Sequence, residues 1–568
     1  MRRLLSLICI TALAVPLAAD EPPPEDERLI ILQAMREELD RSMNELEIED
    51  FEGPYFMSYL VTDERETRIG AANGAIAQER GGHSRVGFVE VRCGDMELDN
   101  SRAGSGMPLL FLYYGQDYSP LPIENEPIAL RTALWQITDR TYKQAVQDHL
   151  TRQGEEVMRV EQEDRPDDFS PAEPERHIDP PLEVEIDEDL WRGRLRRLSS
   201  LFNEHDWIES SHVTLRLEAR TQWCVNSEGS EIVQEAQDWT IFAECTTTAP
   251  EDGQPLSHSL ALNFSRPEDL PGEEELAESI EDLISELEAL RSAPVLDPYT
   301  GPALLAPDVT GVLFHEAIGH RLEGERQRDD DQSGQTFAGK IGDEIIPSFI
   351  SVFDDPTLVE FDGVGINGRY GFDQEGVRAH RVSLIENGVL QTYLMSRTPN
   401  EYVTQSNGHG RSDGLHDPEA RMGTLIVESS EPLTYEELRE RLMEVCREEG
   451  YEFGLIVHDI EGGYTNTSNY GFQAFAEHPR IVYRVDAETG EEELVRGVDI
   501  VGTPLSSINK IVAMGGHSEL FNGFCGSGSG TLPQAEIAPW SLSLEVEFQR
   551  SSTENRRPPL LSPPFALE

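Results

Sequence analysis

The sequence contains very little lysine and few basic residues of any kind. Lysine occurs only at Lys143, Lys340 and Lys510, and Lys and Arg together number 46 against 107 Asp and Glu, which gives a formal net charge of −61. Proteins that bind nucleic acid or anionic membrane surfaces use clustered Lys and Arg to contact phosphates. The sequence has no such basic stripe, so neither nucleic acid nor an anionic membrane surface is an expected partner.

Long apolar runs are absent as well. No segment after residue 19 reaches the roughly 18 uninterrupted apolar residues of a membrane-spanning helix. Residues 1–19 have the features of a secretory signal peptide: Arg2 and Arg3, an apolar stretch from Leu4 to Val15, and small residues ending at Ala19. That stretch is too short for an anchor. The sequence therefore predicts an exported protein, periplasmic or secreted, with no membrane span after signal removal.

Cysteine is sparse, with six residues in the chain. Five remain outside the predicted signal peptide, and one of them, Cys525, is a candidate metal ligand. The other four are Cys93, Cys224, Cys245 and Cys446. Export permits disulfides, and Cys224 and Cys245 lie in two strand-like runs that could pair as a hairpin, so they are the favoured bridge. The alternative, that all four are buried thiols, stays open.

What the chain does contain divides it into two halves. A length of 568 residues indicates two or more domains. Helix and strand periodicities predict α+β folding, with an N-terminal mixed scaffold domain at 20–294, an acidic linker near 160–181, and a β-rich C-terminal domain at 295–549 that carries a metal-binding helix. A polar, proline-rich tail covers 550–568. The predicted N-terminal helices are 29–46, 127–149, 191–202 and 273–291, and the predicted strands are 55–61, 67–77, 84–91, 213–224, 232–245 and 258–264.

The strongest chemical signal is the stretch FHEAIGHRLE at residues 314–323. It places Glu316 directly after His315 and brings a second histidine, His320, soon afterwards. Imidazole nitrogens suit a metal such as zinc, and a glutamate beside the first histidine is the usual general base for a metal-bound water. A charged glutamate next to an apolar run costs several kcal/mol without a partner. These residues therefore favour a metal site over a pair of packed or solvated histidines.

The spacing of the two histidines carries a structural prediction. Five steps along a regular α-helix turn the chain by about 500°, which leaves His315 and His320 about 140° apart. They could not share one metal ion in that geometry. A π-bulge or a broken last turn at Ala317–His320 would bring them together, and Gly319 is the residue best able to absorb the distortion.

The run HEAIGHRLEGE resembles the HExxxH signature of the TldD/PmbA family of zinc metallopeptidases. The resemblance covers roughly Val295 to Phe548 and implies a third metal ligand, Cys525. Family members usually carry a lysine two places after this cysteine, where this chain has Ser527. The resemblance also implies short or unfolded peptide substrates, an enclosed site, and a homodimer or a heterodimer with a family member. Its other blocks, in the family's order, are FDQEGV at 372–377, EARM at 419–422, EGG at 461–463 and GFCG at 523–526.

Together these observations predict an exported zinc-dependent metallopeptidase. His315, His320 and Cys525 would bind Zn²⁺ and leave one position open for water, as catalytic zinc requires. Glu316 would take the proton of that water and pass it to the leaving amine. Glu323, three residues beyond His320, would orient that imidazole.

Two other functions stay open: a non-catalytic partner or peptide-binding subunit of the same family, and a structural zinc protein. The intact ligand set argues against the first of these. The other histidines of the C-terminal half lack a second histidine at metal spacing and are predicted to be structural or solvated; they are His380, His409, His416, His458, His478 and His517.

Overall fold

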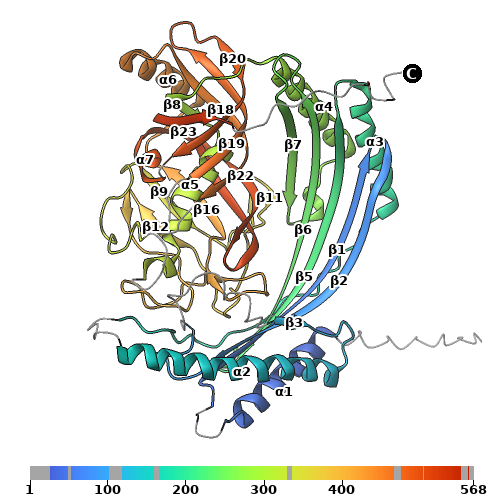
Figure 1. Cartoon of the computed structure of the whole chain (residues 1–568), viewed down its shortest axis with the longest axis vertical. Helices are drawn as coiled ribbons and strands as arrows, with labels where there is room; N and C mark the ends of the chain where they lie inside the picture. The colour runs from blue at the N-terminus through green and yellow to red at the C-terminus, as the bar shows by residue number, and fades with distance from the viewer. Residues whose placement is uncertain are drawn as a thin grey trace, which may run out of the picture.

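Two β-sheets, one in each half of the chain, form the frame of the molecule (Figure 1). The structure, a computed structural model, describes residues 26–48, 51, 53–101, 118–158, 165–328, 335–465, 475–502, 504–551, 561 and 564. The predicted signal peptide and nearly all of the predicted tail lie outside these residues. None of the helices in the described part of the chain has the length and apolar character needed to cross a membrane. The α+β fold class is as predicted.

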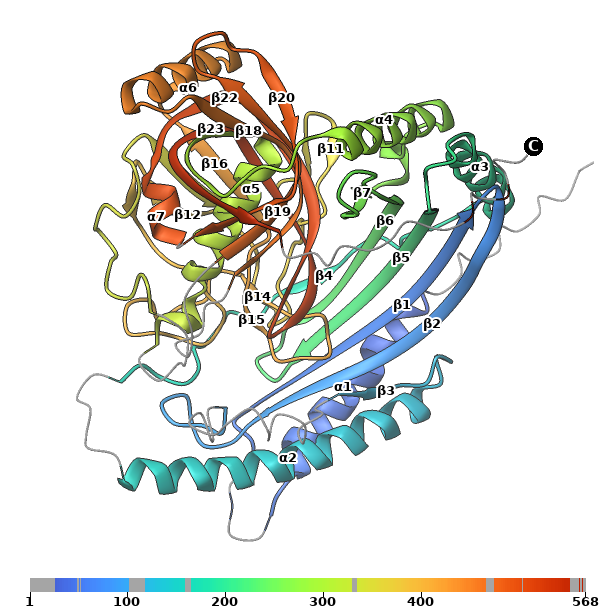
Figure 2. The same ribbon diagram turned by 45° about the horizontal axis from the view of Figure 1, so that its top comes forward.

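The N-terminal sheet has seven strands in the order β3-β2-β1-β5-β6-β4, with β7 also paired to β6. Its strands are long and arched, with α1 and α2 packed near one end and α3 and α4 near the other (Figures 1 and 2). Each end therefore has its own apolar core. The elements are α1 (Arg28–Glu45), β1 (Phe56–Ala72), β2 (Ala75–Arg92), β3 (Tyr118–Pro120), α2 (Pro127–Met158), β4 (Arg176–Ile178), α3 (Glu188–Leu201), β5 (Ser210–Asn226), β6 (Glu231–Thr248), β7 (Pro255–Phe264) and α4 (Glu273–Ser292).

The three strands predicted before residue 92 are in fact two. β1 and β2 pair antiparallel along their whole length around a turn at Asn73-Gly74. Both turn residues have positive φ, 50° and 79°, which is the backbone of a tight two-residue hairpin that Asn-Gly favours. The polar residues that interrupt the apolar pattern of the sequence are mid-strand positions of continuous strands, and most of them are half-buried or exposed. The predicted linker also contributes structure, because β4 at its end joins the sheet beside β6.

The predicted bridge between Cys224 and Cys245 is wrong. Both residues do lie in one hairpin, β5–β6, but the register pairs Cys224 with Ile232 and Cys245 with Ser211. The two thiols are therefore at opposite ends of long strands. All five cysteines in the described part of the chain are free and buried, so the alternative of buried thiols holds.

The C-terminal half forms a twelve-stranded mixed sheet that curls around helix α5, with α6 on its outer side (Figure 1). The main apolar core lies between α5 and the sheet. The larger elements are β8 (Tyr299–Leu305), α5 (Pro307–Ala317), β9 (Ile350–Asp354), β12 (Val382–Glu386), β16 (Thr424–Ser429), α6 (Tyr435–Glu449), β18 (Phe453–Thr465), β19 (Phe475–Asp486), β21 (Val498–Gly502), α7 (Pro504–Asn509), β22 (Ile511–Ser527) and β23 (Gly530–Arg550). The short strands are β10 (Glu360–Phe361), β11 (Val364–Gly365), β13 (Val389–Leu390), β14 (Gly410–Arg411), β15 (Glu419–Ala420), β17 (Pro432–Leu433) and β20 (Glu492–Val495).

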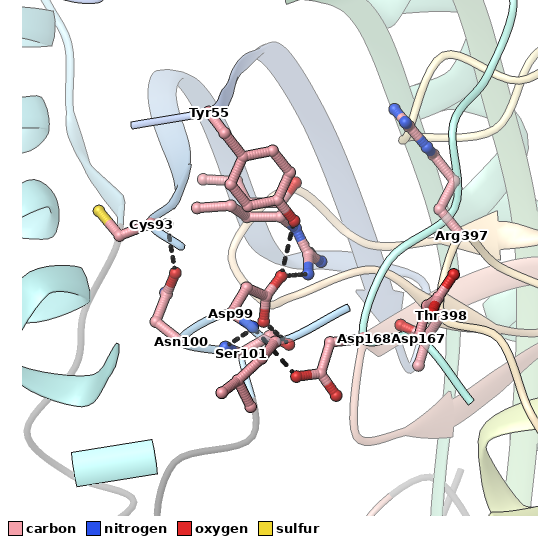
Figure 3. Close-up of polar contacts among 12 residues, drawn as sticks. Tyr55, Cys93, Asp99, Asn100, Ser101, Asp167, Asp168, Arg397 and Thr398 are labelled. Atoms are coloured by element: carbon pink, nitrogen blue, oxygen red, sulfur yellow. Dashed lines mark hydrogen bonds and ion pairs between the residues drawn. The ribbon is translucent and has the colours of Figure 1, made fainter. Parts of the chain in front are cut away.

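Buried polar contacts join the two halves near the start of β1 and the end of β2, next to the cluster around Asp99 that Figure 3 shows. The Arg397 guanidinium of the C-terminal half donates from Nε to the Ser170 carbonyl at 2.9 Å, and the Ser170 amide donates back to the Arg397 carbonyl at 2.9 Å. Next to Ser170, an Asp168 carboxylate oxygen accepts from the amide of Asp99 at 3.1 Å. Asp99 in turn pairs with Arg92 of β2 at 2.7 Å. The N-terminal sheet is thus tied to the loops that surround α5.

Candidate metal centre

Helix α5 carries the first histidine into the centre of the C-terminal domain. Pro307 occupies its first turn, where a missing amide hydrogen costs nothing, and ten of its eleven residues are buried. The α-helix ends at Ala317, and a 3₁₀ turn spans Gly319–Leu322. The predicted interruption is therefore present as a broken last turn and not as a π-bulge. It places the imidazole rings of His315 and His320 4.7 Å apart, at 90° to each other.

Two glycines allow α5 and the turn after it to pack closely against β23 and Met422. A Cβ on Gly311 would lie 2.8 Å from the Cβ of Glu536 on β23, and a Cβ on Gly319 would collide with the Met422 sulfur. Gly319 is thus needed for space at the broken turn, and Met422 belongs to the EARM block of the sequence. The packing holds both histidines against β23 and the loop before β16.

Cys525 reaches the two histidines from a strand two hundred residues away. It lies on β22, opposite Leu532 of β23. Its Sγ is 3.2 Å from His315 Nε2 and 3.4 Å from His320 Nε2, all three side chains are buried, and the three donor atoms lie within 4.8 Å of one another. A tetrahedral zinc ion holds sulfur and imidazole donors about 3.5 Å apart, given bonds of about 2.3 and 2.0 Å. The donor types and their spacing fit zinc.

The Nδ1 atom of each imidazole, on the side away from Cys525, lies next to a carboxylate oxygen. His320 Nδ1 lies 2.8 Å from Glu323 Oε1, and His315 Nδ1 lies 2.8 Å from Glu536 Oε1. These contacts turn both Nε2 atoms toward Cys525, the arrangement usual for metal-binding histidines. Glu323 was anticipated from its spacing, whereas Glu536 was missed. Its only signal in the sequence is an acidic residue in an apolar strand, with nothing to indicate its target.

Arg421 is a second residue that sequence reasoning missed. It is fully buried, and its guanidinium donates to the Cys525 carbonyl at 2.8 Å, to Ser529 Oγ at 3.0 Å, and approaches Cys525 Sγ at 3.1 Å. Its Nε also lies 3.7 Å from Glu323. Arg421 therefore touches both the candidate sulfur ligand and the carboxylate behind His320.

Local charge favours the ionised forms that metal ligation needs. Burial alone would raise the pKa of the Cys525 thiol, but His315 and His320 lower it to about 4. Burial also opposes ionisation of Glu323, but Arg326 and His320 hold its pKa at about 2. A thiolate at neutral pH is the form that binds zinc.

Glu316 lies beside this cluster and packs against the EGG block. It is buried, and burial raises the pKa of its carboxyl. A Cβ on Gly463 of β18 would lie 2.9 Å from Glu316 Cγ, so the glycine leaves room for the glutamate. Glu477 of β19 stands opposite Gly463. It is fully buried, neither carboxylate oxygen has a hydrogen-bond partner among the described residues, and burial raises its pKa well above the usual value.

The comparisons with known proteins concern mainly the half of the chain that holds this cluster. Residues 298–542 match the family described as the PmbA/TldA metallopeptidase C-terminal domain. A metalloprotease of Methanocaldococcus jannaschii is 30% identical over 232 residues, which is 40% of this chain and 46% of that protein. A zinc metalloprotease TldD homolog of Saccharolobus solfataricus is 29% identical over 253 residues, 44% of this chain and 51% of the relative. The chain thus spans about half the length of the curated relatives it matches.

A solved structure resembles the fold over a larger part of the chain. TldE from Thermococcus kodakarensis superimposes with a TM-score of 0.57 at 14% identity, over 91% of this chain and 100% of that one. The likeness extends into the N-terminal half, which lies outside the family match at residues 298–542. At this identity it speaks for the fold alone.

Proposed function

We propose, from the match of residues 298–542 to the PmbA/TldA metallopeptidase C-terminal domain, that the protein is a zinc-dependent peptidase that hydrolyses peptide bonds in short or unfolded peptides. The observation that carries the proposal is the convergence of His315, His320 and Cys525 on one point from distant parts of the chain. Three protein ligands of this kind match a catalytic rather than a closed structural zinc site, which has four.

His315 Nε2, His320 Nε2 and the Cys525 thiolate are the atoms that would hold zinc. When bound, the ion supplies a Lewis acid that lowers the pKa of water and polarises a carbonyl group. Glu536 and Glu323 keep the two imidazoles in the required tautomer and orientation.

Glu316 is the proposed general base. It accepts a proton from the water that attacks the scissile carbonyl carbon, and it returns that proton to the amine as the carbon–nitrogen bond breaks. Its position directly after His315 and its burial support this role. Because burial raises the pKa of its carboxyl, Glu316 is also better suited to hold a proton between the two steps.

The decisive experiment compares Glu316→Gln with the wild-type protein. We expect the variant to keep its zinc, measured by elemental analysis, and to lose about 10²- to 10⁴-fold in the cleavage of a mixed peptide set. Glu440→Gln, at an exposed glutamate on α6, is the matched control and should cleave like the wild type. Unchanged cleavage by Glu316→Gln, or a wild-type protein without zinc, would contradict the proposal.

Export and assembly belong to the same proposal. The features of residues 1–19 support export to the periplasm or beyond, and the amino-terminal sequence of the protein recovered outside the cytoplasm should begin near Asp20. A dimer, either of two copies or with a family member, is what the resemblance to the TldD/PmbA family implies. Sedimentation of the purified chain at several concentrations tests the homodimer; a chain that stays monomeric at all of them would favour a second partner.

A further inference from the structure

A pocket of about 410 Å³ lies between the N-terminal sheet and the loops of the C-terminal domain. Residues of β5 and β6 line one side of it, and residues 366–378 with parts of β14 and β23 line the other. Five of its lining residues are arginines against three acidic residues, in a chain whose net charge is −61. The arginines are Arg220, Arg266, Arg369, Arg378 and Arg411.

Three of these arginines are already neutralised. Arg220 pairs with Asp238, while Arg266 and Arg378 pair with acidic side chains of their surroundings. The remaining two, Arg369 and Arg411, have no carboxylate within ion-pair distance in the described parts of the chain. Of these two, Arg369 is exposed to solvent and Arg411 is buried, so Arg411 is the buried cation of the pocket that no carboxylate of the described residues neutralises.

Arg411 is the more unusual of the two because it is buried. Only 5% of it is exposed, its guanidinium donates to the carbonyls of Met422 and Pro533, and its cation stacks over the Tyr370 ring at 4.6 Å. Carbonyl oxygens and an aromatic face stabilise a guanidinium only in part, and a buried cation without a counter-ion is costly. A bound anion would offset that cost.

Asn367 gives a second and independent indication of a ligand. It lines the same pocket, is 6% exposed, and neither its amide nitrogen nor its amide oxygen has a hydrogen-bond partner among the described residues. Buried amides are nearly always paired. A polar group entering the pocket would satisfy the Asn367 side chain and meet the arginines at the same time.

The pocket adjoins the hairpin that carries the candidate sulfur ligand. Leu532 and Pro533 of β23 line it, and they stand opposite Cys525 and Phe524 of β22. The pocket wall is therefore one strand spacing, about 5 Å, from the backbone of Cys525. A group bound here is close enough to belong to a molecule that also reaches the metal centre.

We propose that this arginine pocket binds a carboxylate of the peptide substrate. The inference rests on the proposed peptidase function and adds a substrate class to it. Guanidinium groups bind carboxylates with charge-assisted hydrogen bonds, and the Asn367 amide adds a donor. The carboxylate belongs either to the peptide C-terminus or to an acidic side chain, and both sources offer the same chemistry.

The test measures peptide binding to the Glu316→Gln variant by calorimetry, so that turnover plays no part. Matched hexapeptides carry a free C-terminal carboxylate or a C-terminal amide, and an internal Asp or Asn. We expect one of the two acidic peptides to bind about tenfold more tightly than its neutral counterpart. A difference between carboxylate and amide at the C-terminus identifies the terminal carboxylate as the bound group, and a difference between Asp and Asn identifies the side chain. Adding Arg369→Gln or Asn367→Ala should bring the ratio close to one, while adding Arg80→Gln, at an exposed arginine on β2, should leave it intact.

The two proposals fail in different ways. Absence of zinc-dependent cleavage by the wild-type protein would defeat the peptidase function. Equal affinity for acidic and neutral peptides, or a preference that survives both Arg369→Gln and Asn367→Ala, would overturn the arginine pocket even where cleavage is normal.

Discussion

Helix α4 of the N-terminal domain and helix α5 of the C-terminal domain bury different kinds of side chain. In α4 of the N-terminal domain the buried residues are all leucine and isoleucine, on one face of an amphipathic helix. In α5 nearly every residue is buried, including His315 and Glu316. In the N-terminal domain, the buried Asp99 carboxylate forms an ion pair with Arg92. In the C-terminal domain, the buried Glu477 carboxylate beside Glu316 has no hydrogen-bond partner among the described residues. Helix α4 thus buries apolar side chains alone, whereas α5 also buries the polar groups of the candidate metal centre.

The largest effect should come from removing the sulfur ligand. Cys525→Ala should lower zinc affinity, measured by competition with a chelator, by more than the 10- to 100-fold typical of outer partners, and should abolish peptide cleavage. Cys446→Ala removes a buried thiol of α6 in the same domain and should leave zinc affinity unchanged. Equal zinc binding by Cys525→Ala and wild type would show that the cluster is not the metal site.

A core truncation in the N-terminal domain should separate stability from metal binding. Leu283→Ala on α4 should reduce the free energy of unfolding by about 2–5 kcal/mol, through lost burial and a cavity, without changing zinc affinity. Urea unfolding followed by tryptophan fluorescence gives the first quantity and chelator competition the second. Leu29→Ala, at an exposed position of α1, is the control and should change neither. A parallel loss of zinc affinity in Leu283→Ala would mean that the two cores are not independent.

The carboxylate behind His315 should matter more for the metal than for the fold. Glu536→Gln should lower zinc affinity by about 10- to 100-fold, because the imidazole loses its orienting anion. The control is Glu547→Gln, at an exposed glutamate on the same strand, where no change is expected. If Glu536→Gln instead raises zinc affinity, the carboxylate destabilises the site and does not orient His315.

The last prediction concerns Glu477 and pH. Burial raises its pKa in the folded state well above the ordinary 4.5, so the folded protein holds a proton that the unfolded chain releases as pH rises above about 4.5. Stability therefore falls with rising pH through this group, by at most about 1.4 kcal/mol per pH unit. Glu477→Gln should flatten that decline in urea unfolding measured from pH 5 to 8. An unchanged slope would show that Glu477 is ionised in the folded protein.

The broken turn between the two histidines was predictable because its geometry is local. Two histidines five positions apart cannot share a face of a regular helix, so a broken turn followed from the spacing, and α5 does end at Ala317. Amphipathic helices such as α1 and α4 were predictable for the same reason. The paired strands were harder, since solvent-facing polar residues in β1 and β2 look like interruptions until the partner strand is known.

What the sequence determined by itself was the kind of chemistry: which donor atoms are available, and that the helix must break to bring two of them together. Only the tertiary structure decided the rest. It kept Cys224 and Cys245 apart through strand register, brought Glu536 and Arg421 to the site, and placed Asn367 in the same pocket as Arg411, a buried arginine without an ion pair. These contacts join residues far apart in the chain, and such contacts depend on how whole sheets pack, which no local pattern of side chains encodes.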